Sequence, residues 1–201
     1  GALDAHVLAT ASGTTPDPAY VSLPQPWDWT NGAGLDAHGF VYPPVNADAS
    51  APAGDLPPLL VLVHGGPTSH SEPVYKVQTQ FWTSRGFLVL DVNHGGGTAY
   101  GRAYRERLTG QWGVVDIDDV VSGVRSLADA GRIDPDRVAI RGGSAGGYTV
   151  LRALTTSTVF AAGTSYFGIS DLAVLLVDDH KFESRYTTTL VGPWPEAASV
   201  Y

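Results

Sequence analysis

Short, strongly apolar segments alternate along the chain with segments whose apolar residues recur at helical spacing. The apolar segments are predicted to be strands, at residues 35–42, 59–63, 87–92, 138–140 and 161–167. Helices are predicted between and after them, around residues 74–82 and 117–128, through Leu151 and Leu154, and from residue 171 to 177. Several strands are apolar at every position, which is typical of a parallel sheet covered by helices on both faces. The pattern therefore predicts an α/β fold with a mostly parallel sheet.

The first 25 residues follow a different pattern. Residues 6–11 and 19–23 are predicted to be two short strands around a turn rich in Gly, Thr and Pro, and Pro24-Gln25-Pro26 is predicted to be a stiff connector. An isolated hairpin is only marginally stable in water. We therefore expect residues 1–25 to be part of a larger β-structure and residues 26–201 to form the α/β unit.

A glycine-rich turn between a predicted strand and a predicted helix carries the strongest chemical signal. Residues 142–147 read Gly-Gly-Ser-Ala-Gly-Gly, which contains the G-x-S-x-G pattern of a nucleophile elbow. Ser144 is then the candidate nucleophile, lifted above the sheet by a sharp turn. Side chains at Gly142 and Gly146 would collide with the neighbouring strand and helix. The alternative is a tight turn without catalytic function, but the strand before it and the helix after it favour the catalytic interpretation.

A second motif, His64-Gly65-Gly66-Pro67, directly follows another apolar strand. In α/β-hydrolases the loop at this place supplies one backbone N–H of the oxyanion hole, and the residue after the nucleophile supplies the other. We therefore expect Gly66 and Ala145 to be the two donors. For His64 a structural role is preferred, in which it orients the loop by hydrogen bonding.

With these motifs in order, the chain resembles the prolyl oligopeptidase family of serine peptidases. The likeness is carried by residues 64–67, by NHGGGTAYGR at 93–102, by Gln111-Trp112-Gly113 with Asp116 and Asp119, and by RGGSAGGY at 141–148. It is greatest with the acylaminoacyl-peptidase and dipeptidyl-peptidase-like branch. The resemblance implies an α/β-hydrolase domain that cleaves short peptides through an acyl-enzyme.

The same resemblance implies an N-terminal β-propeller, of which residues 1–25 would be the last strands. It assigns Ser144 as nucleophile, and Gly66 and Ala145 as oxyanion donors. Two positions depart from the family. Residues 67–70 contain no tyrosine where several relatives have one, and His94-Gly95-Gly96 stand where relatives often have Arg-Gly-Ser.

The triad acid and histidine are not evident in the sequence. In this fold the order is Ser, acid, His, and His180 is the single histidine after Ser144, with Asp171, Asp178 and Asp179 before it as candidate acids. No further strands precede them as the fold requires. We therefore expect the catalytic domain to be truncated, with its acid and base beyond Tyr201, and we expect negligible turnover from this chain alone. The absence of any methionine also suggests a piece of a longer protein.

Composition excludes several other functions. The net charge is −8 and the 12 basic residues form no run, which disfavours nucleic acid and anionic membranes as partners. There is no cysteine, so disulfides, thiolate metal sites and cysteine nucleophiles are excluded, and a cytoplasmic location is expected. Neither a metal-ligand spacing nor a phosphate-binding loop is present, so no metal or cofactor is expected.

The substrate and the partners are less well defined by the sequence. Tyr148 and Tyr166 are the preferred candidates for a substrate pocket, although aromatic residues at such spacing are more often part of a core. The expected partners are a short peptide and the remainder of the catalytic domain and propeller, and a homo-oligomer is left open. Two other functions stay open, a carboxylesterase or lipase of the same fold and a non-catalytic binding module.

Overall fold

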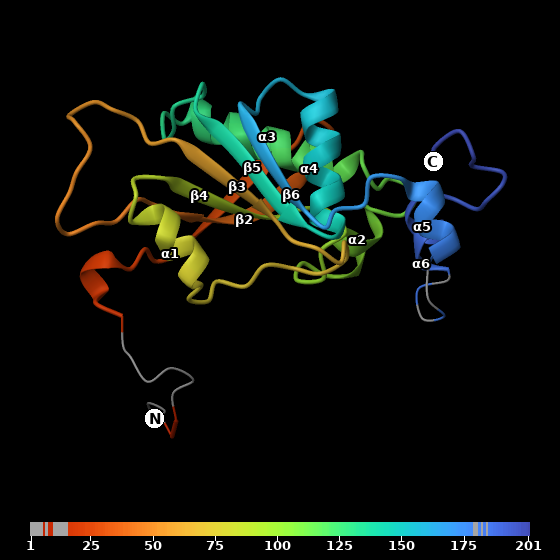
Figure 1. Ribbon diagram of the computed structural model, residues 1–201, viewed down its shortest axis with the longest axis horizontal. Coiled ribbons are helices and arrows are strands. Elements are labelled where there is room, and N and C mark those ends of the chain that lie inside the picture. The colour runs from red at the N-terminus through yellow and green to blue at the C-terminus, as the bar shows by residue number, and fades with distance from the viewer. Residues whose placement is uncertain (1–5, 7, 10–15, 179–180, 182, 184) are drawn as a thin grey trace.

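The computed structural model describes residues 6, 8–9, 16–178, 181, 183 and 185–201. These residues form one mixed sheet with helices packed around it. Within these residues the sheet has six strands in the order β1-β2-β4-β3-β5-β6 (Figure 1). The strands are β1 (Gln25–Thr30), β2 (Asp36–Tyr42), β3 (Leu59–Val63), β4 (Leu88–Asn93), β5 (Val138–Gly143) and β6 (Ala162–Tyr166). Every strand predicted from an apolar segment after residue 26 is present.

The strand directions bring three chain segments together at one edge of the sheet. β1 and β2 are antiparallel, β2 is antiparallel to β4, and β3, β4, β5 and β6 are parallel. Val63 of β3 pairs with Val92 of β4 and with Gly142 of β5. The segments that follow these strands therefore lie side by side at the carboxyl edge, where ligands bind in parallel α/β sheets.

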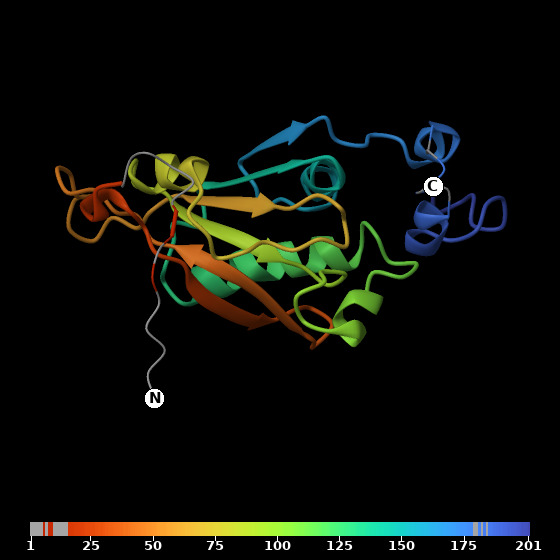
Figure 2. The same ribbon diagram turned by 90° about the horizontal axis from the view of Figure 1, so that it is seen from below.

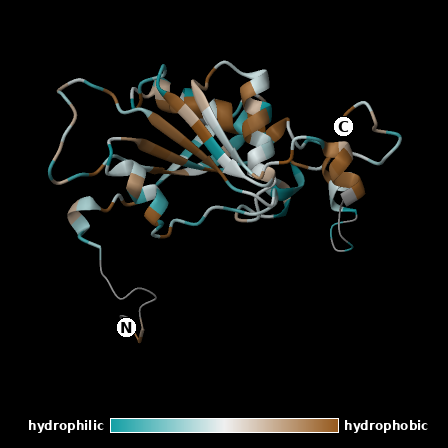
Figure 3. Cartoon of the chain, in the orientation of Figure 1, coloured by the Kyte–Doolittle hydropathy of each residue, from teal (hydrophilic) through white to brown (hydrophobic). Residues whose placement is uncertain are grey.

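Helices cover both faces of the sheet, as predicted. They are α1 (Val77–Thr83), α2 (Arg102–Glu106), α3 (Val115–Asp129), α4 (Ala145–Thr156), α5 (Leu172–Asp178) and α6 (Tyr186–Leu190). Leu59 and Val61 of β3 point into the large core beneath α3 and α4, whereas Leu60 between them packs in a smaller cluster with Trp82 of α1. This period of two places one core on each face, and Figure 3 shows apolar residues concentrated in the central strands.

The last two helices lie apart from the sheet. Figures 1 and 2 show α5 and α6 beyond its carboxyl edge. They are held there by a second apolar cluster, in which Leu172 and Leu190 pack with Leu108 and Trp112. No helix within the described residues has the length and apolar character that a bilayer span requires.

The strand predicted at residues 19–23 is wrong. Pro18–Tyr20 form a 3-10 turn, because the Asp17 carboxylate accepts a hydrogen bond from a backbone N–H of the turn at 3.0 Å and proline fixes the first φ angle. The backbone of Ser22 then pairs with the side-chain amide of Gln80, at 2.7 and 3.1 Å, and not with a second strand. Both backbone groups of Ser22 are thus hydrogen-bonded without a hairpin.

The neighbouring predictions have different outcomes. The other predicted strand, residues 6–11, lies mostly outside the described residues. The predicted connector Pro24-Gln25-Pro26 runs into β1, which pairs only with β2 and so forms one edge of the sheet. A proline such as Pro26 is tolerated on an edge strand, because the missing N–H costs no bond inside the sheet.

The helix predicted around residues 74–82 is present, but most of its apolar residues are exposed, and Trp82 is the one that packs against the core. Val74 lies before α1, and Val77 is 70% exposed. The buried residues of this helix are instead Thr79, Gln80 and Thr83. Gln80 is buried because its amide serves the backbone of the N-terminal segment.

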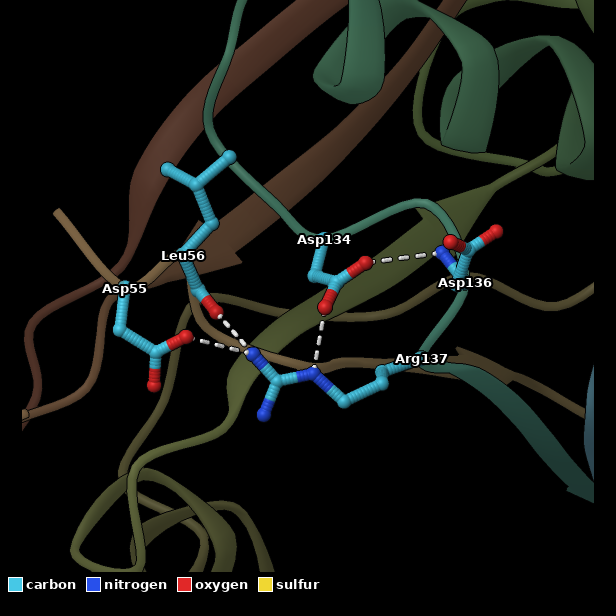
Figure 4. A network of polar contacts seen from close by, with 5 residues as sticks. All are labelled: Asp55, Leu56, Asp134, Asp136 and Arg137. Atoms are coloured by element: carbon cyan, nitrogen blue, oxygen red, sulfur yellow. Dashed lines mark hydrogen bonds and ion pairs between the residues drawn. The ribbon is translucent and has the colours of Figure 1, made fainter.

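One arginine ties the loop between β2 and β3 to the start of β5. The Arg137 guanidinium donates hydrogen bonds to Asp134 at 2.6 Å, to Asp55 at 3.0 Å and to the carbonyl oxygen of Leu56 at 2.7 Å (Figure 4). The hydrogen bond from Arg137 lowers the pKa of the Asp134 carboxyl. A pocket of about 790 Å³ lies beside this network, lined by residues that precede β3, β4 and β5. It therefore lies at the amino edge of the sheet, opposite to the edge where these strands end.

Candidate active site

Ser144 lies between β5 and α4, at the carboxyl edge of the sheet. Its backbone has φ 55° and ψ −123°, a conformation that residues with a Cβ rarely adopt. Its N–H donates to the carbonyl oxygen of Tyr166 at the end of β6, at 3.0 Å. The residue is exposed, so this turn presents the Ser144 hydroxyl to solvent above the sheet.

The two glycines around Ser144 have no room for a side chain. A Cβ at Gly142 would contact the carbonyl group of Gly146 in the first turn of α4, with its carbon at 2.6 Å. A Cβ at Gly146 would contact the carbonyl oxygens of Val63 and His64, the latter at 2.7 Å. Both neighbours are backbone atoms that cannot rotate away. The steric requirement expected at these positions is therefore present.

The loop after β3 lies against this turn. A Cβ on Gly65 would be 3.2 Å from the carbonyl oxygen of Gly143 and 3.5 Å from the Cβ of Ser144. Gly66 has φ +123°, which favours glycine. Ala145 is the first residue of α4, so its N–H has no partner inside the helix. Neither the Gly66 nor the Ala145 N–H donates to any residue that the structure describes, and both expected oxyanion donors belong to segments that meet at Ser144.

Tyr186 of α6 holds the same loop from the other side, and sequence reasoning missed it. Its hydroxyl accepts a hydrogen bond from the N–H of Thr68 at 3.2 Å and lies 2.6 Å from the Thr68 hydroxyl. The two residues are 118 positions apart. A single tyrosine in a polar segment carries no signal of such a contact in the sequence.

Among the described residues, none makes a hydrogen bond with the Ser144 hydroxyl, so no catalytic base is in place there. His70 instead lies 2.8 Å from the hydroxyl of Thr98. His180, the histidine that follows Ser144 in the sequence, and Asp179 lie outside the described residues.

Asp171 and Asp178, the other candidate acids, belong to α5. The Asp171 carboxylate accepts hydrogen bonds from two backbone N–H groups, at 2.9 and 3.0 Å, as an N-cap of the helix. Asp178 is the last residue of the helix. The structure thus gives Asp171 a structural role as a helix cap. Within the described part of the chain, no histidine is hydrogen-bonded to the Ser144 side chain.

The aromatic candidates for a substrate pocket lie in different surroundings. Tyr148 is half-buried against Trp112, with ring centroids 4.7 Å apart, as in the core interpretation. Tyr166 is 41% exposed, and the Arg141 guanidinium lies 4.8 Å from the centre of its ring. Phe167 is 85% exposed and has φ 40°. Tyr166 and Phe167 thus offer exposed aromatic surface directly beside the turn of Ser144.

Asp116 is one of two buried carboxylates on α3 that support the loops at this edge. It accepts hydrogen bonds from the N–H of Gly113 at 2.7 Å and from the hydroxyl of Thr149 at 2.6 Å. Burial raises the pKa of Asp116. The bond to Thr149 joins α3 to α4, the helix that begins at the nucleophile turn.

Asp119 is the second buried carboxylate. It accepts from the N–H of Gly95 at 2.6 Å and from the amide of Asn31 at 2.7 Å. Burial raises the pKa of Asp119 to about 6. No group of three or more His, Asp or Glu side chains that could hold a metal ion occurs in the described part of the chain.

Comparison with known proteins identifies the family. The model of the prolyl oligopeptidase family matches residues 73–199, which include Ser144 and the helix that follows it. The chain belongs to the prolyl oligopeptidase family. This confirms the resemblance inferred from the motifs, and the α/β-hydrolase fold with it.

Relatives within the prolyl oligopeptidase family are named as peptidases. A puromycin-hydrolyzing peptidase of Mycobacterium tuberculosis is 48% identical with a TM-score of 0.95, over 98% of this chain and 30% of that chain. An acylaminoacyl peptidase of Pyrococcus horikoshii is 26% identical with a TM-score of 0.79, over 90% of this chain and 29% of that chain. Dipeptidyl aminopeptidase BIII of Pseudoxanthomonas mexicana is 39% identical over 136 residues, which are 66% of this chain and 20% of that protein. The chain therefore spans less than a third of the length of each of these relatives.

Proposed function

We propose that this chain carries the nucleophile part of a serine peptidase that hydrolyses short peptides through an acyl-enzyme on Ser144. One observation carries the proposal. Ser144 is exposed at a strained strand-to-helix turn, and the Gly65–Gly66 loop lies against it. Membership of the prolyl oligopeptidase family supports the same chemistry.

In the proposed mechanism the Ser144 hydroxyl attacks the carbonyl carbon of the scissile amide. The oxygen that becomes negative accepts hydrogen bonds from the N–H groups of Gly66 and Ala145, while the positive end of the α4 dipole favours this charge. The leaving amine takes the proton that the serine lost, and water then hydrolyses the ester on Ser144. Losing one oxyanion donor costs about 10²–10³ in rate.

The proton transfers need a histidine held by a carboxylate. We place both in the remainder of the catalytic domain, as the family resemblance implies, and residues 1–25 at the end of an N-terminal β-propeller. The 201-residue chain alone then has negligible turnover, because no described histidine is bonded to the Ser144 hydroxyl. The absence of cysteine supports a cytoplasmic location.

The proposed substrates are short peptides and aminoacyl amides, of the acylaminoacyl-, dipeptidyl- or oligopeptidase type. The puromycin-hydrolyzing relative makes puromycin a suitable first substrate. The exposed rings of Tyr166 and Phe167 would contact an apolar side chain next to the scissile bond.

The test compares three forms of the full-length protein that carries this chain: the wild type, Ser144→Ala and Ser170→Ala. Ser170 is a matched control, because it is also exposed and its side chain makes no hydrogen bond with the described residues. A fluorophosphonate should label the wild type and Ser170→Ala, and should not label Ser144→Ala. Puromycin and an aminoacyl p-nitroanilide should be hydrolysed by the same two forms.

The alternatives predict different results. A carboxylesterase or lipase of the same fold would cleave a p-nitrophenyl ester and leave the p-nitroanilide intact. A non-catalytic module would not be labelled in any form. Either outcome would refute the peptidase proposal.

A further inference from the structure

Two histidines are stacked beneath the loop that faces Ser144. His64 directly follows β3 and His94 directly follows β4, and these strands are parallel neighbours. Their ring centroids are 4.5 Å apart with an angle of 19° between the planes. His94 is fully buried. The role expected of His64, orienting its loop by hydrogen bonding, does not explain why its ring stacks on that of His94.

The hydrogen bonds define which nitrogen of each ring carries the proton. Nδ1 of His64 lies 2.9 Å from the carbonyl oxygen of Gly65, and Nδ1 of His94 lies 2.9 Å from that of Gly95. A carbonyl oxygen only accepts, so both Nδ1 atoms are protonated. Both Nε2 atoms are buried without a hydrogen-bond partner among the described residues. Each ring is therefore a neutral imidazole with its proton on Nδ1.

The bond from His64 determines where the next amide points. The carbonyl of Gly65 and the N–H of Gly66 belong to one planar peptide unit, in which they point in opposite directions. Fixing the Gly65 oxygen against Nδ1 of His64 therefore fixes the direction of the Gly66 N–H. This N–H is the proposed oxyanion donor.

His94 is held more rigidly than His64. Its Nδ1–H is bonded to the Gly95 carbonyl, and the N–H of Gly95 is bonded to the buried Asp119 carboxylate at 2.6 Å. The segment after β4 is thus fixed to α3, and its imidazole forms a fixed surface on which the His64 ring lies.

We propose that His94 is a positioning residue for the oxyanion hole, which acts through the ring of His64 on the Gly66 amide. The proposal rests on the proposed function for its catalytic consequence, but not for the state of the histidine pair. Burial followed by the proximity of His94 lowers the pKa of His64 to about 3. Burial also lowers the pKa of His94. The other ionisable groups that act on His64 are Asp91, which raises its pKa, and His70, which lowers it.

The first experiment measures the tautomers directly, in long-range ¹H–¹⁵N spectra of the ¹⁵N-labelled 201-residue chain between pH 5 and 8. In the wild type both histidines should be neutral with the proton on Nδ1 at every pH. His94→Ala should give His64 mixed tautomers and a pKa closer to 6.5, while His94→Phe, which keeps a stacked ring, should preserve the Nδ1–H form. His70→Gln is the matched control, which removes an exposed histidine of the same loop and should leave the Nδ1–H tautomer of His64 unchanged.

The second experiment measures turnover of an aminoacyl p-nitroanilide by the full-length protein. His94→Ala should lower kcat about tenfold and leave KM unchanged. This loss is smaller than the loss of about 10²–10³ that follows removal of an oxyanion donor, because the Gly66 N–H is misdirected but still present. His94→Phe should restore most of this activity. A failure of the proposed function would appear as an unlabelled, inactive wild type, and the spectra would still decide the state of the pair.

Three results would overturn the proposal. One is a wild-type His64 or His94 with its proton on Nε2, or a wild-type pair that titrates near pH 6.5. Another is a folded His94→Ala chain in which the tautomer of His64 is unchanged. The third is a His94→Ala enzyme with wild-type kcat. The wild-type spectra need no variant, so the proposal remains testable if His94→Ala does not fold.

Discussion

Replacing Ser144 by glycine should stabilise the chain while it removes the proposed nucleophile. Ser144 has φ 55° and ψ −123°, and a residue with a Cβ held in such a sparsely populated region costs about 1–3 kcal/mol. Glycine adopts positive φ without this cost. Its greater freedom in the unfolded chain offsets about 0.5–1 kcal/mol of the gain. The net expectation is a free energy of unfolding higher by about 0.5–2 kcal/mol.

Ser144→Ala is the reference variant for this experiment. Alanine keeps the Cβ and the strain, and like glycine it lacks the hydroxyl, which makes no hydrogen bond with the described residues. The free energies of unfolding of the two variants are compared by urea denaturation, followed by circular dichroism and by the fluorescence of the five tryptophans. A Ser144→Gly chain that is no more stable than Ser144→Ala would refute the argument that the turn is strained.

Three further changes test the surroundings of the turn. Gly146→Ala should lower the free energy of unfolding by about 3 kcal/mol or more by urea denaturation, since the new Cβ meets the carbonyl oxygen of Val63; a loss below 1 kcal/mol would contradict it. Burial raises the pKa of Asp119 to about 6, so the folded chain holds the proton of this carboxyl more tightly than the unfolded chain does. The free energy of unfolding should therefore be highest below pH 4 and should fall by about 3 kcal/mol in total as the pH rises through 6. The stability difference between wild type and Asp119→Asn, measured across this range, should show that slope, and a constant difference would contradict it. Tyr186→Phe should lower the free energy of unfolding by about 1 kcal/mol through loss of its bonds to Thr68, and a double-mutant cycle with Thr68→Val should show coupling between the two residues.

The buried strands could be predicted from the sequence because both of their faces are apolar. β3 was expected at residues 59–63 and is found there, and β4 was expected at residues 87–92 and is found at Leu88–Asn93. The nucleophile turn could be predicted for a similar reason, since a serine between glycines in the order of residues 142–147 is a local pattern. Such patterns can be found in the sequence because strand periodicity and the backbone geometry of a turn depend on residues that are adjacent in the chain.

Elements that depend on distant partners could not be predicted. The segment at residues 19–23 has the composition of a strand, but the side chain of Gln80 takes the backbone bonds of Ser22 from 58 positions away. α2 and α6 have five residues each, too few to show a helical period. The apolar residues of α1 predicted one buried face, but Val77 and Phe81 are exposed, Thr79, Gln80 and Thr83 are buried, and Trp82 packs against the core.

The sequence by itself determined the α/β class, the family, and Ser144 with its flanking glycines, because apolar periodicity and a glycine turn act over a few residues. Only the tertiary structure decided what surrounds that turn. His64 and His94 are 30 positions apart, and they meet because the parallel strands β3 and β4 end side by side. Thr68 and Tyr186 are 118 positions apart, and they meet because an apolar cluster holds α6 beside the sheet. Contacts of this kind depend on strand order and on helix packing, which no local pattern of residues records.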